Sequence, residues 1–574
     1  MDVTIDRSST AGPTGRPARQ QDSNPPVKQT LLTRAARALA LSLTLLVPGF
    51  AQAQASAPGL PTLKALEASG ARIGKIHIAA QDVFDTDDPA EDKLLFRWAN
   101  QLHIQTRPGV IERALLFKTG EPLSVRLIEE TERLLRANRY LYDVDIRPVA
   151  YQDGVVDLEV LTQDTWSLDP GLSAGRTGGV STSGIQLKEF NLLGTGGSVS
   201  LGHSKGVDRS SNEFEFGSDR VFGTRASLRY SHATNSDGQR DAASVVRPFY
   251  ELDSRWAAGA TTSKEDRLDP VYNAGNLVSQ YRHRMSQKEV FGGWSAGLVE
   301  GWVQRYSLGV SVQDDTYLPE PGLATPAQLP SDQRLVAPFV RYELIEDRFE
   351  KELNRNLIGR PEFFALGLAS TMQLGRAVTG LGSSEDAWLY SASVSRGFQP
   401  APEHTLITSA RISGRYTGGQ VQRQSLGAQA QYYLPQSRRW LFYAAAAGDT
   451  LTHPSPEDAL LLDGEAGLRG YPLRYQSGTR RTLITVEERF FTDLYVWRLF
   501  RIGGAAFFDA GRAWGGDNVN KANPGWLRDA GFGLRIVSAR SAFGNVLHVD
   551  LAFPIDATPD IKKIQFLVKS RTSF

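Results

Sequence analysis

Residues 293–297 (GWSAG) have the spacing of a nucleophile elbow, in which a serine between two glycines attacks an acyl group. That chemistry requires a strand, a strained turn and a helix, with a histidine and an acid converging on the serine. Here apolar and polar residues alternate around Ser295, and no helical pattern follows it. We therefore interpret this segment as a strand with small residues, and we expect no enzymatic activity.

Two further patterns could in principle bind a cofactor or a metal. Residues 194–197 (GTGG) are glycine-rich, but they are not followed by the helix that a dinucleotide or phosphate cradle requires. The eight histidines are scattered along the chain, and none has the spacing of a zinc site. The sequence therefore predicts neither a cofactor nor a metal.

The composition indicates an exported protein that does not bind nucleic acid. The chain of 574 residues contains no Cys, which suits an oxidising compartment. Setting aside the six basic and three acidic residues of 1–55 leaves 58 basic residues against 60 acidic ones. This near balance lacks the basic surface that nucleic-acid binding requires.

Residues 1–55 have the features of a polar leader followed by a secretory signal peptide. Arg34 and Arg37 precede the apolar run 38–47 (ALALSLTLLV), and small residues alternate at 51–55 (AQAQA). The run is too short for a membrane-spanning helix, and no later stretch approaches the roughly 20 apolar residues that such a helix needs. The mature chain is therefore expected to be a soluble periplasmic protein or an outer-membrane barrel.

After a linker at 56–71, residues 72–165 are predicted to form a small α/β domain. The alternation at 72–78 (RIGKIHI) predicts a strand, and the spacing of Leu and Ile after Ser124 predicts a capped helix. Turn residues at 152–154 (QDG) predict a hairpin. The expected order is a strand at 72–78, helices near 110–117 and at 123–137, and strands at 142–149 and 155–162.

From residue 172 to residue 574 the sequence consists of short alternating runs separated by Gly, Asn, Asp and Pro. Residues 226–230 and 250–258, for example, place apolar or aromatic side chains on one face only. Alternation alone does not distinguish a soluble sandwich from a membrane barrel. The length, the export signal and the terminal aromatic Phe574 favour a barrel, with a long extracellular loop at 314–334.

The fold class is therefore predicted to be mainly β. With about 25 residues for each strand and its connection, the barrel region accommodates about 16 strands, an even number as bacterial barrels require. We expect a transmembrane antiparallel β-barrel of about 16 strands, preceded by one small α/β domain.

Several motifs resemble those of the BamA/TamA outer-membrane assembly and two-partner secretion superfamily, whose barrel defines the bacterial surface antigen family. Residues 72–165 are similar to a POTRA domain, with 120–123 (GEPL) and 138–140 (NRY) in the places usual for that domain. Segments of the barrel region resemble, in order, the opening hairpin, the signature loop, the Phe-x-Asp-x-Gly strand and the last strands of that family. These segments are 189–201 (EFNLLGTGGSVSL), 464–471 (GEAGLRGY), 507–511 (FFDAG), 531–535 (GFGLR) and 549–554 (VDLAFP).

The resemblance implies a lumenal site, because the family's signature loop folds into the barrel and its arginine pairs with the aspartate of the Phe-x-Asp-x-Gly strand. A guanidinium–carboxylate fork is stronger in a lumen of reduced dielectric than at a surface. Taken alone, Arg469 would be read as a solvated loop residue; the motif downstream favours the pair. The implied site comprises Arg469, Gly470 and Tyr471 in the loop, and Asp509, Glu487 and Gly511 on the strands.

The resemblance also implies a function in outer-membrane protein insertion or in protein translocation. The POTRA-like domain would hold an unfolded or secreted client protein by β-augmentation at an edge strand containing Tyr142, Val144 and Ile146, and would pass it to the barrel. The first barrel strand is expected at 185–193, and it would meet the terminal strand 564–574 at a weak seam. Three aromatic or apolar residues are expected to form the terminal strand signal: Phe566, Val568 and Phe574.

The expected location is the outer membrane of a Gram-negative bacterium, with the POTRA-like domain in the periplasm. The other expected partners are outer-membrane lipid and, as further candidates, periplasmic proteins. A diffusion or uptake channel without client handling is the alternative, and it predicts steady conductance. The room for only one POTRA-like domain, and the polar Ser570 and Thr572 near the terminus, depart from the family pattern. The client therefore cannot be assigned from any one subfamily.

Overall fold

A computed structural model of the protein describes residues 60–177, 180–273, 276–326, 328–455, 458–516, 525–541, 546–559 and 561–571. All of them belong to one compact unit, Ser56–Phe574. The expected leader and signal peptide at 1–55 lie outside the described residues, as does Phe574 of the expected terminal signal. Among the helices of the described part, none has the length and apolar character needed to cross a membrane.

Residues 60–164 form a small α/β domain. Its elements are α2 (Leu63–Ala68), β1 (Arg72–Gln81), α3 (Leu94–Leu102), α4 (Pro108–Glu112), α5 (Val125–Arg136), β2 (Leu141–Gln152) and β3 (Val155–Asp164). The sheet has the order β1-β3-β2, with β1 parallel and β2 antiparallel to β3. This arrangement fits a POTRA-like domain. It also contains α3, which the sequence pattern did not predict.

Local sequence accounts for the form of this domain. The Ser124 side chain caps α5 by accepting from the Leu127 N–H at 3.5 Å. Asp153 and Gly154 both have positive φ, as the tight turn between β2 and β3 requires. Leu63 and Leu66 of α2 are buried in the domain core, because α2 packs there with α5 and the sheet. The described part of the expected linker, residues 60–71, therefore contributes to the folded domain.

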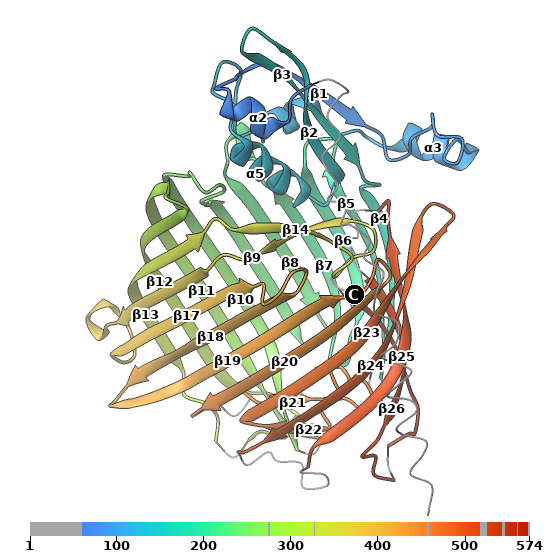
Figure 1. The fold of residues 1–574 in the computed structure, drawn as a ribbon. Helices are drawn as coiled ribbons and strands as arrows, with labels where there is room; N and C mark the ends of the chain where they lie inside the picture. Colours follow the sequence, from blue (N-terminus) through green and yellow to red (C-terminus); the bar gives the residue numbers. More distant parts are fainter. Residues whose placement is uncertain are drawn as a thin grey trace, which may run out of the picture. The chain divides into compact units, whose positions relative to one another are not determined.

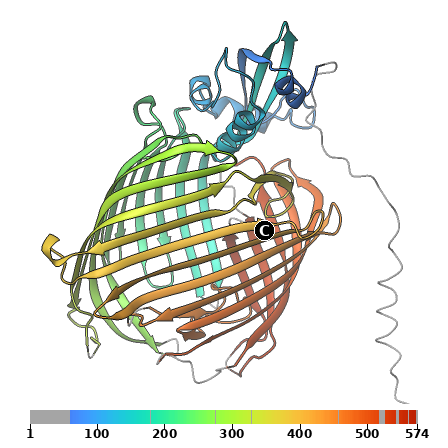
Figure 2. The ribbon, with the colours of Figure 1, turned by 60° about the vertical axis from the view of Figure 1, so that its left-hand side comes forward.

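In the described part of the chain, twenty strands form a closed antiparallel barrel, which corrects the expected number of about 16. Figures 1 and 2 show these strands wrapped around a common axis. The first ten are β4 (Leu168–Thr177), β5 (Val180–Leu192), β6 (Gly197–Lys205), β7 (Ser210–Ser218), β8 (Ser227–Asn235), β9 (Gly238–Arg247), β10 (Trp256–Asn273), β11 (Asn276–Val299), β12 (Trp302–Pro319) and β13 (Gln333–Glu346). The second ten are β16 (Ala369–Ala377), β17 (Ala387–Phe398), β18 (Thr405–Thr417), β19 (Gln420–Pro435), β20 (Trp440–Thr452), β23 (Arg480–Val496), β24 (Phe500–Trp514), β25 (Leu527–Ser538), β26 (Val546–Pro554) and β27 (Gln565–Arg571).

The expected strand number was too low because many connections are shorter than the alternating pattern reveals. β8 ends at Asn235 and β9 begins at Gly238, and the connections from β11 to β12 and from β18 to β19 are equally tight. Short hairpin turns leave more residues for strands.

Three boundaries also differ from expectation. The first barrel strand is β4, and the range 185–193 falls on the second strand, β5, and the turn that follows it. Residues 250–255 lie in the connection between β9 and β10, where the Ser254 N–H donates to the Glu251 carbonyl and forms a turn. Residues 314–319 extend β12, so the expected loop at 314–334 begins only after Pro319.

The outer surface of the barrel is apolar. Along β12, Tyr306, Leu308 and Val310 are exposed on the outside, and Leu308 reaches 68% exposure. The alternate residues Arg305 and Ser307 point inward. An apolar exterior on a closed barrel, in which every strand is paired, is the arrangement that lets strands cross a bilayer. The protein is therefore a transmembrane β-barrel.

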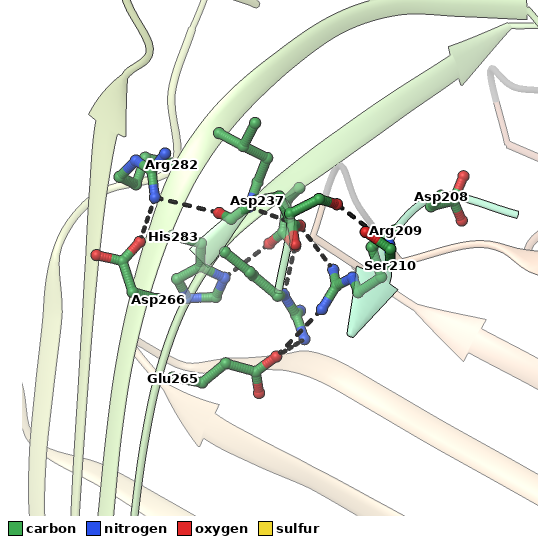
Figure 3. Close-up of polar contacts among 12 residues, drawn as sticks. Asp208, Arg209, Ser210, Asp237, Glu265, Asp266, Arg282 and His283 are labelled. Carbon is green, nitrogen blue, oxygen red and sulfur yellow. Dashed lines mark hydrogen bonds and ion pairs between the residues drawn. The ribbon is translucent and has the colours of Figure 1, made fainter. Parts of the chain in front are cut away.

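The barrel has a near end, where β4 begins at Leu168 after the small domain, and an opposite far end. Ion pairs link strands and connections at the far end, on the side of β7 to β11 (Figure 3). Arg209 lies 3.1 Å from Asp237, and Arg282 lies 2.5 Å from Asp266. These pairs hold the far rim of that wall together.

Six short elements of the described part lie outside the barrel wall. They are η1 (Val221–Gly223), η2 (Thr379–Leu381), the hairpin of β14 (Phe349–Leu353) with β15 (Pro361–Ala365), and the pair of β21 (Leu460–Leu462) with β22 (Gln476–Gly478). The hairpin β14–β15 lies in a connection at the near end, whereas β21–β22 lies in a connection at the far end. The second of these pairs supports the loop that carries Arg469.

Candidate functional site in the lumen and at the seam

The signature loop, residues 464–471, lies in the connection between β20 and β23 and is held in shape by residues of that connection. β21 and β22 pair at its base, from Leu460 with Gly478 to Leu462 with Gln476. Above them, the buried Asp463 carboxylate accepts from three backbone N–H groups at 2.6–2.9 Å, those of Glu465, Ala466 and Arg474. Asp463 therefore closes the turn that presents Arg469.

Arg469 lies in the barrel interior and is 3% exposed. Its Nε and Nη2 donate to the two carboxylate oxygens of Asp509 at 2.7 and 2.9 Å, and its Nη1 donates to Glu487 at 2.8 Å. The guanidinium also lies 3.4 Å from the centre of the Phe507 ring. A two-pronged ion pair with a second carboxylate and a stacked ring fixes both the position and the orientation of the guanidinium.

Gly470 and Tyr471 extend this attachment to the next strand. The Gly470 N–H donates to Asp529 of β25 at 3.0 Å, and a Cβ on Gly470 would lie 2.7 Å from the Asp529 Cβ. Only glycine permits so close an approach. Tyr471 is fully buried, and its hydroxyl donates to the Arg528 carbonyl at 3.0 Å. The loop therefore contacts β25 as well as β24, because Asp529 on β25 is the register partner of Asp509 on β24.

Gly511 lies on β24, the strand that carries Asp509, and it faces the base of the loop. A Cβ on Gly511 would lie 3.1 Å from Leu462 of β21 and 2.9 Å from the Thr482 carbonyl. Leu462 is fully buried in a cluster with Leu468 and Tyr471. The small residue thus leaves room for the apolar underside of the loop.

Glu487 joins the signature loop to a second lumenal element. Its other carboxylate oxygen accepts from the Nε of Arg489 at 2.9 Å. Arg489 in turn donates to the carbonyl of Arg355, in the hairpin β14–β15, at 2.9 Å. Glu487 therefore lies between two arginines: Arg469, which belongs to the far-end loop, and Arg489, which contacts the near-end hairpin.

The hairpin β14–β15 packs against the inner wall at the near end. Ile358 and Phe364 belong to a buried cluster with Tyr433, Tyr443 and Phe491, which lie on β19, β20 and β23. At its tip, the Glu362 carboxylate accepts from the backbone N–H groups of Asn356 and Leu357 at 2.9 and 3.0 Å. The hairpin is therefore an ordered structure with an apolar anchor in the barrel mouth.

The expected client-binding residues lie on β2, which is an outer strand of the small sheet. Tyr142 is half-buried, whereas the side chains of Val144 and Ile146 are fully buried. Backbone groups at the outer edge of β2 already have partners on α5. The Ile146 N–H donates to Glu132 at 2.9 Å, and the Val144 carbonyl accepts from Arg136.

Two further features occupy the same edge. Arg360, at the tip of the hairpin β14–β15, donates to the Leu141 carbonyl at 3.2 Å. Pro148, in the second half of β2, has no N–H to offer. An added strand would therefore displace side chains of α5 and of the hairpin before it could pair with β2.

The barrel closes between its first and last strands, β4 and β27. Among the described residues, the two strands share a single pair in register, Val568 with Arg176. β27 pairs with β26 along its whole length, and β4 pairs in the same way with β5. The junction of β4 and β27, called the seam below, is therefore the least paired of the junctions in the barrel. Of the expected terminal signal, Phe566 is exposed on β27, and Val568 lies in the seam itself.

The GWSAG segment lies on β11, and the Ser295 hydroxyl donates to the Gln304 carbonyl on β12 at 2.7 Å. This contact ties two neighbouring strands near the end of β11.

Sequence reasoning missed Asp463, Asp529, Arg489 and the hairpin β14–β15. Asp529 could have been found, because it stands two residues before the motif at 531–535 and therefore shares a strand face with Gly531. Arg489 likewise stands two residues after Glu487. The partner of Arg489 on the hairpin has no sequence signal, because the contact joins segments more than a hundred residues apart.

Comparisons with known proteins found similarity only at the level of structure. Searches of the sequence against protein-family models and curated proteins found no match. BamA from Haemophilus ducreyi, lacking POTRA domains 1-3, matches over 86% of this chain and 84% of its own, with 13% identity and a TM-score of 0.36. CdiB from Escherichia coli matches over 87% and 76%, with 13% identity and a TM-score of 0.46.

The FrpB iron transporter from Neisseria meningitidis also matches, over 75% of this chain and 79% of its own, with 9% identity and a TM-score of 0.37. BamA, to whose superfamily the motifs are similar, is thus among the structural matches. Identities this low and TM-scores below 0.5 concern the fold alone, and they assign no function.

Proposed function

We propose that the chain is an outer-membrane barrel of the BamA/TamA and two-partner secretion superfamily that inserts or translocates client proteins. In this proposal the small domain lies in the periplasm and meets the client first. The far end of the barrel then faces the cell exterior. The proposal requires no covalent chemistry, and we assign no catalytic role to Ser295, whose hydroxyl is engaged by the neighbouring strand.

The observation that carries this proposal is the seam. A strand edge with few hydrogen bonds can pair with an incoming strand at little cost, because little existing pairing is lost. The seam offers such an edge on either side when Val568 separates from Arg176. Each neighbouring junction would first have to break a continuous ladder. A client strand is therefore expected to add at β4 or β27.

The lumenal contacts support the proposal by keeping the rest of the barrel fixed. The signature loop is attached to β23, β24 and β25 through Glu487, Asp509 and Asp529. These strands precede β26 and β27 in the barrel order. They would form a rigid wall against which the seam opens.

The hairpin β14–β15 provides a physical link between the small domain and the lumen. The side chain of Arg360, at the hairpin tip, donates to the Leu141 carbonyl on β2. The Arg355 carbonyl accepts from the side chain of Arg489. A client strand that displaces Arg360 from Leu141 would free the hairpin tip. We propose that capture of a client by the small domain loosens the hairpin in this way.

The test is depletion of the protein in its own bacterium, followed by quantitative proteomics of the periplasm and outer membrane. The proposal predicts that outer-membrane proteins or a secreted protein accumulate in the periplasm. Complementation with the intact chain should reverse the accumulation. Unchanged levels of every such protein would contradict the proposal.

A second candidate function is a diffusion or uptake channel, favoured by one cavity. This cavity, of about 590 Å³, lies inside the wall formed by β6 to β12, and Glu215, Ser244 and Gln287 are among the polar residues that line it. A channel predicts steady conductance of the purified protein in planar bilayers, together with unchanged client levels on depletion. The proposed function predicts instead that clients accumulate in the periplasm on depletion.

A further inference from the structure

Helix α3 presents an apolar face that nothing in the small domain covers. It lies in the segment 82–107, between β1 and α4, and Figure 1 shows it apart from the three-stranded sheet. The side chains on the exposed face are Leu94, Leu95, Trp98 and Leu102, and Leu102 reaches 75% exposure. Their spacing places them on one side of the helix.

The opposite face of α3 is fully engaged. Phe96 is buried and stacks on Phe84 with ring centres 4.1 Å apart. The Asn100 side chain donates to the Phe84 carbonyl at 2.8 Å and accepts from the Phe84 N–H at 3.1 Å. The orientation of the helix is therefore fixed, and the exposed apolar face is not a consequence of a loose segment.

The same segment is attached to the near end of the barrel. Leu499, in the turn between β23 and β24, packs against the cluster of Val83, Phe84 and Phe96. Arg540, after the end of β25, pairs with Glu91 and donates to the Val83 carbonyl at 3.1 Å. These contacts place α3 beside the near-end turns of the strands that lead to the seam.

The neighbouring barrel turn is also apolar and exposed. Leu494, in the last residues of β23, and Trp497, in the turn after it, are both largely exposed. Aromatic and apolar residues at a barrel rim mark the depth of the membrane interface. The exposed face of α3 thus continues an apolar rim instead of standing alone.

We propose that α3 lies in the phospholipid leaflet at the near end of the barrel, with Trp98 and Leu102 among the acyl chains. Lys93 and Arg97, exposed beside the apolar face, are placed to contact lipid phosphates, although Arg97 also pairs with Asp92 at 3.1 Å. An amphipathic helix with apolar and basic faces binds an interface in this way. This inference rests on the membrane-spanning barrel of the proposed function.

The helix would then hold the small domain against the membrane next to the seam. A phospholipid surface is favoured over a protein partner because α3 is fixed to the rim of a barrel whose outer surface already faces lipid. The helix α3 would also disturb lipid packing close to the place where a client strand is expected to leave the barrel.

The absence of Cys in the chain permits a direct test with single-cysteine variants. The full chain carrying Leu102→Cys, labelled with an environment-sensitive fluorophore, is reconstituted in phosphatidylethanolamine–phosphatidylglycerol vesicles. Lys64→Cys, exposed on α2 of the same small domain, is the control. Leu308→Cys on the outer barrel surface reports whether the barrel itself spans the bilayer.

The inference predicts that nitroxides on the lipid chains quench the label at 102 strongly and that its emission is shifted to the blue, with much weaker effects for the label at 64. Iodide in the aqueous phase should quench the control label more strongly than the label at 102. Quenching at 308 combined with full iodide access at 102 would overturn the inference and leave the barrel proposal intact. Absence of lipid quenching at 308 would overturn both.

Discussion

Val568 and Arg176 form the single pair in register that joins the last strand of the barrel to its first, among the residues that the structure describes. Most of the lumenal contacts described above stabilise strands away from this junction, although Lys569 of β27 also donates to the Glu465 carbonyl of the signature loop at 2.9 Å. The ion pairs of Arg469 fasten the signature loop to β23 and β24, and Gly470 fastens it to β25. Stability is therefore distributed unevenly around the barrel, with its minimum at the seam.

Loss of Arg469 should destabilise the barrel strongly. Arg469→Ala leaves the buried Asp509 carboxylate without the charge that compensates it and leaves Glu487 with Arg489 alone, which costs about 3–5 kcal/mol. Arg469→Lys should recover only part of this, because an ammonium cannot form the two-pronged contact. The measurement is the urea midpoint of unfolding of the protein refolded in detergent micelles.

The control for this prediction is Arg284→Ala. Arg284 is exposed and lies 3.0 Å from Asp266, so this surface pair should contribute about 0–1 kcal/mol. Equal effects of Arg469→Ala and Arg284→Ala would show that the lumenal pair is no stronger than a surface pair.

A methyl group at position 470 should push the signature loop away from the wall. In Gly470→Ala the added Cβ would approach the Asp529 Cβ to 2.7 Å and the Pro554 nitrogen to 3.1 Å, and neither atom can move freely. Such overpacking costs about 1–3 kcal/mol. We expect faster trypsin cleavage within the loop, which intact-mass spectrometry would detect. Gly448→Ala, whose Cβ would meet nothing closer than 3.9 Å, should cleave as the unmodified protein does.

The hairpin β14–β15 should limit ion flow through the near end. Replacing residues 355–362 with a Gly-Ser linker removes Ile358 from the buried cluster and removes the Glu362 carboxylate that holds the turn. We expect a clear rise in single-channel conductance in planar bilayers. The same replacement of the far-end residues 322–330 is the control and should have little effect. Unchanged conductance in the hairpin variant would mean that the hairpin does not obstruct the mouth.

The outer edge of β2 should weaken as pH rises. Burial raises the pKa of Glu132 above its usual value, against the smaller opposing effects of Arg136 and the Ile146 N–H. A carboxyl group with a raised pKa stabilises the folded domain below its unfolded pKa, and this contribution is lost as pH rises through the folded pKa. Hydrogen exchange at β2, corrected for the intrinsic rate, should therefore show easier opening at neutral pH than in mild acid.

Glu132→Gln supplies the control for this pH dependence, because an amide keeps a hydrogen-bond acceptor and does not titrate. Burial also raises the pKa of Glu130, so part of the dependence should remain in the variant. Identical pH profiles for the variant and the unmodified protein would exclude Glu132 as the titrating group.

Alternating residues predicted the class of fold because a period of two survives whether a strand faces lipid or a core. The same pattern did not fix the number of strands. Alternation does not reveal how few residues a turn needs, as between Asn235 and Gly238. For the same reason β4, rich in small residues, was not separated from β5 in the sequence.

Sequence reasoning reached the central pair of the candidate site because a motif named each partner. Arg469 and Asp509 belong to two such motifs, and the structure places them in contact. The contacts of Arg489 with Arg355 and of Arg360 with Leu141 depend on how the hairpin folds back, which no local pattern encodes. Helix α3 is short, and its apolar residues are exposed, so core periodicity did not identify it.

The central claim is that the seam must open for a client to pass. The chain has no Cys, so Arg176→Cys with Val568→Cys would place one disulfide across the seam. Phe532→Cys with Leu551→Cys, a pair within the continuous ladder of β25 and β26, is the matched control. The measurement is the amount of client in the outer membrane or medium of a depleted strain expressing each variant. We predict that the oxidised seam variant fails to restore the client, that dithiothreitol rescues it, and that the control restores the client in both states. Full restoration by the oxidised seam variant would contradict the account.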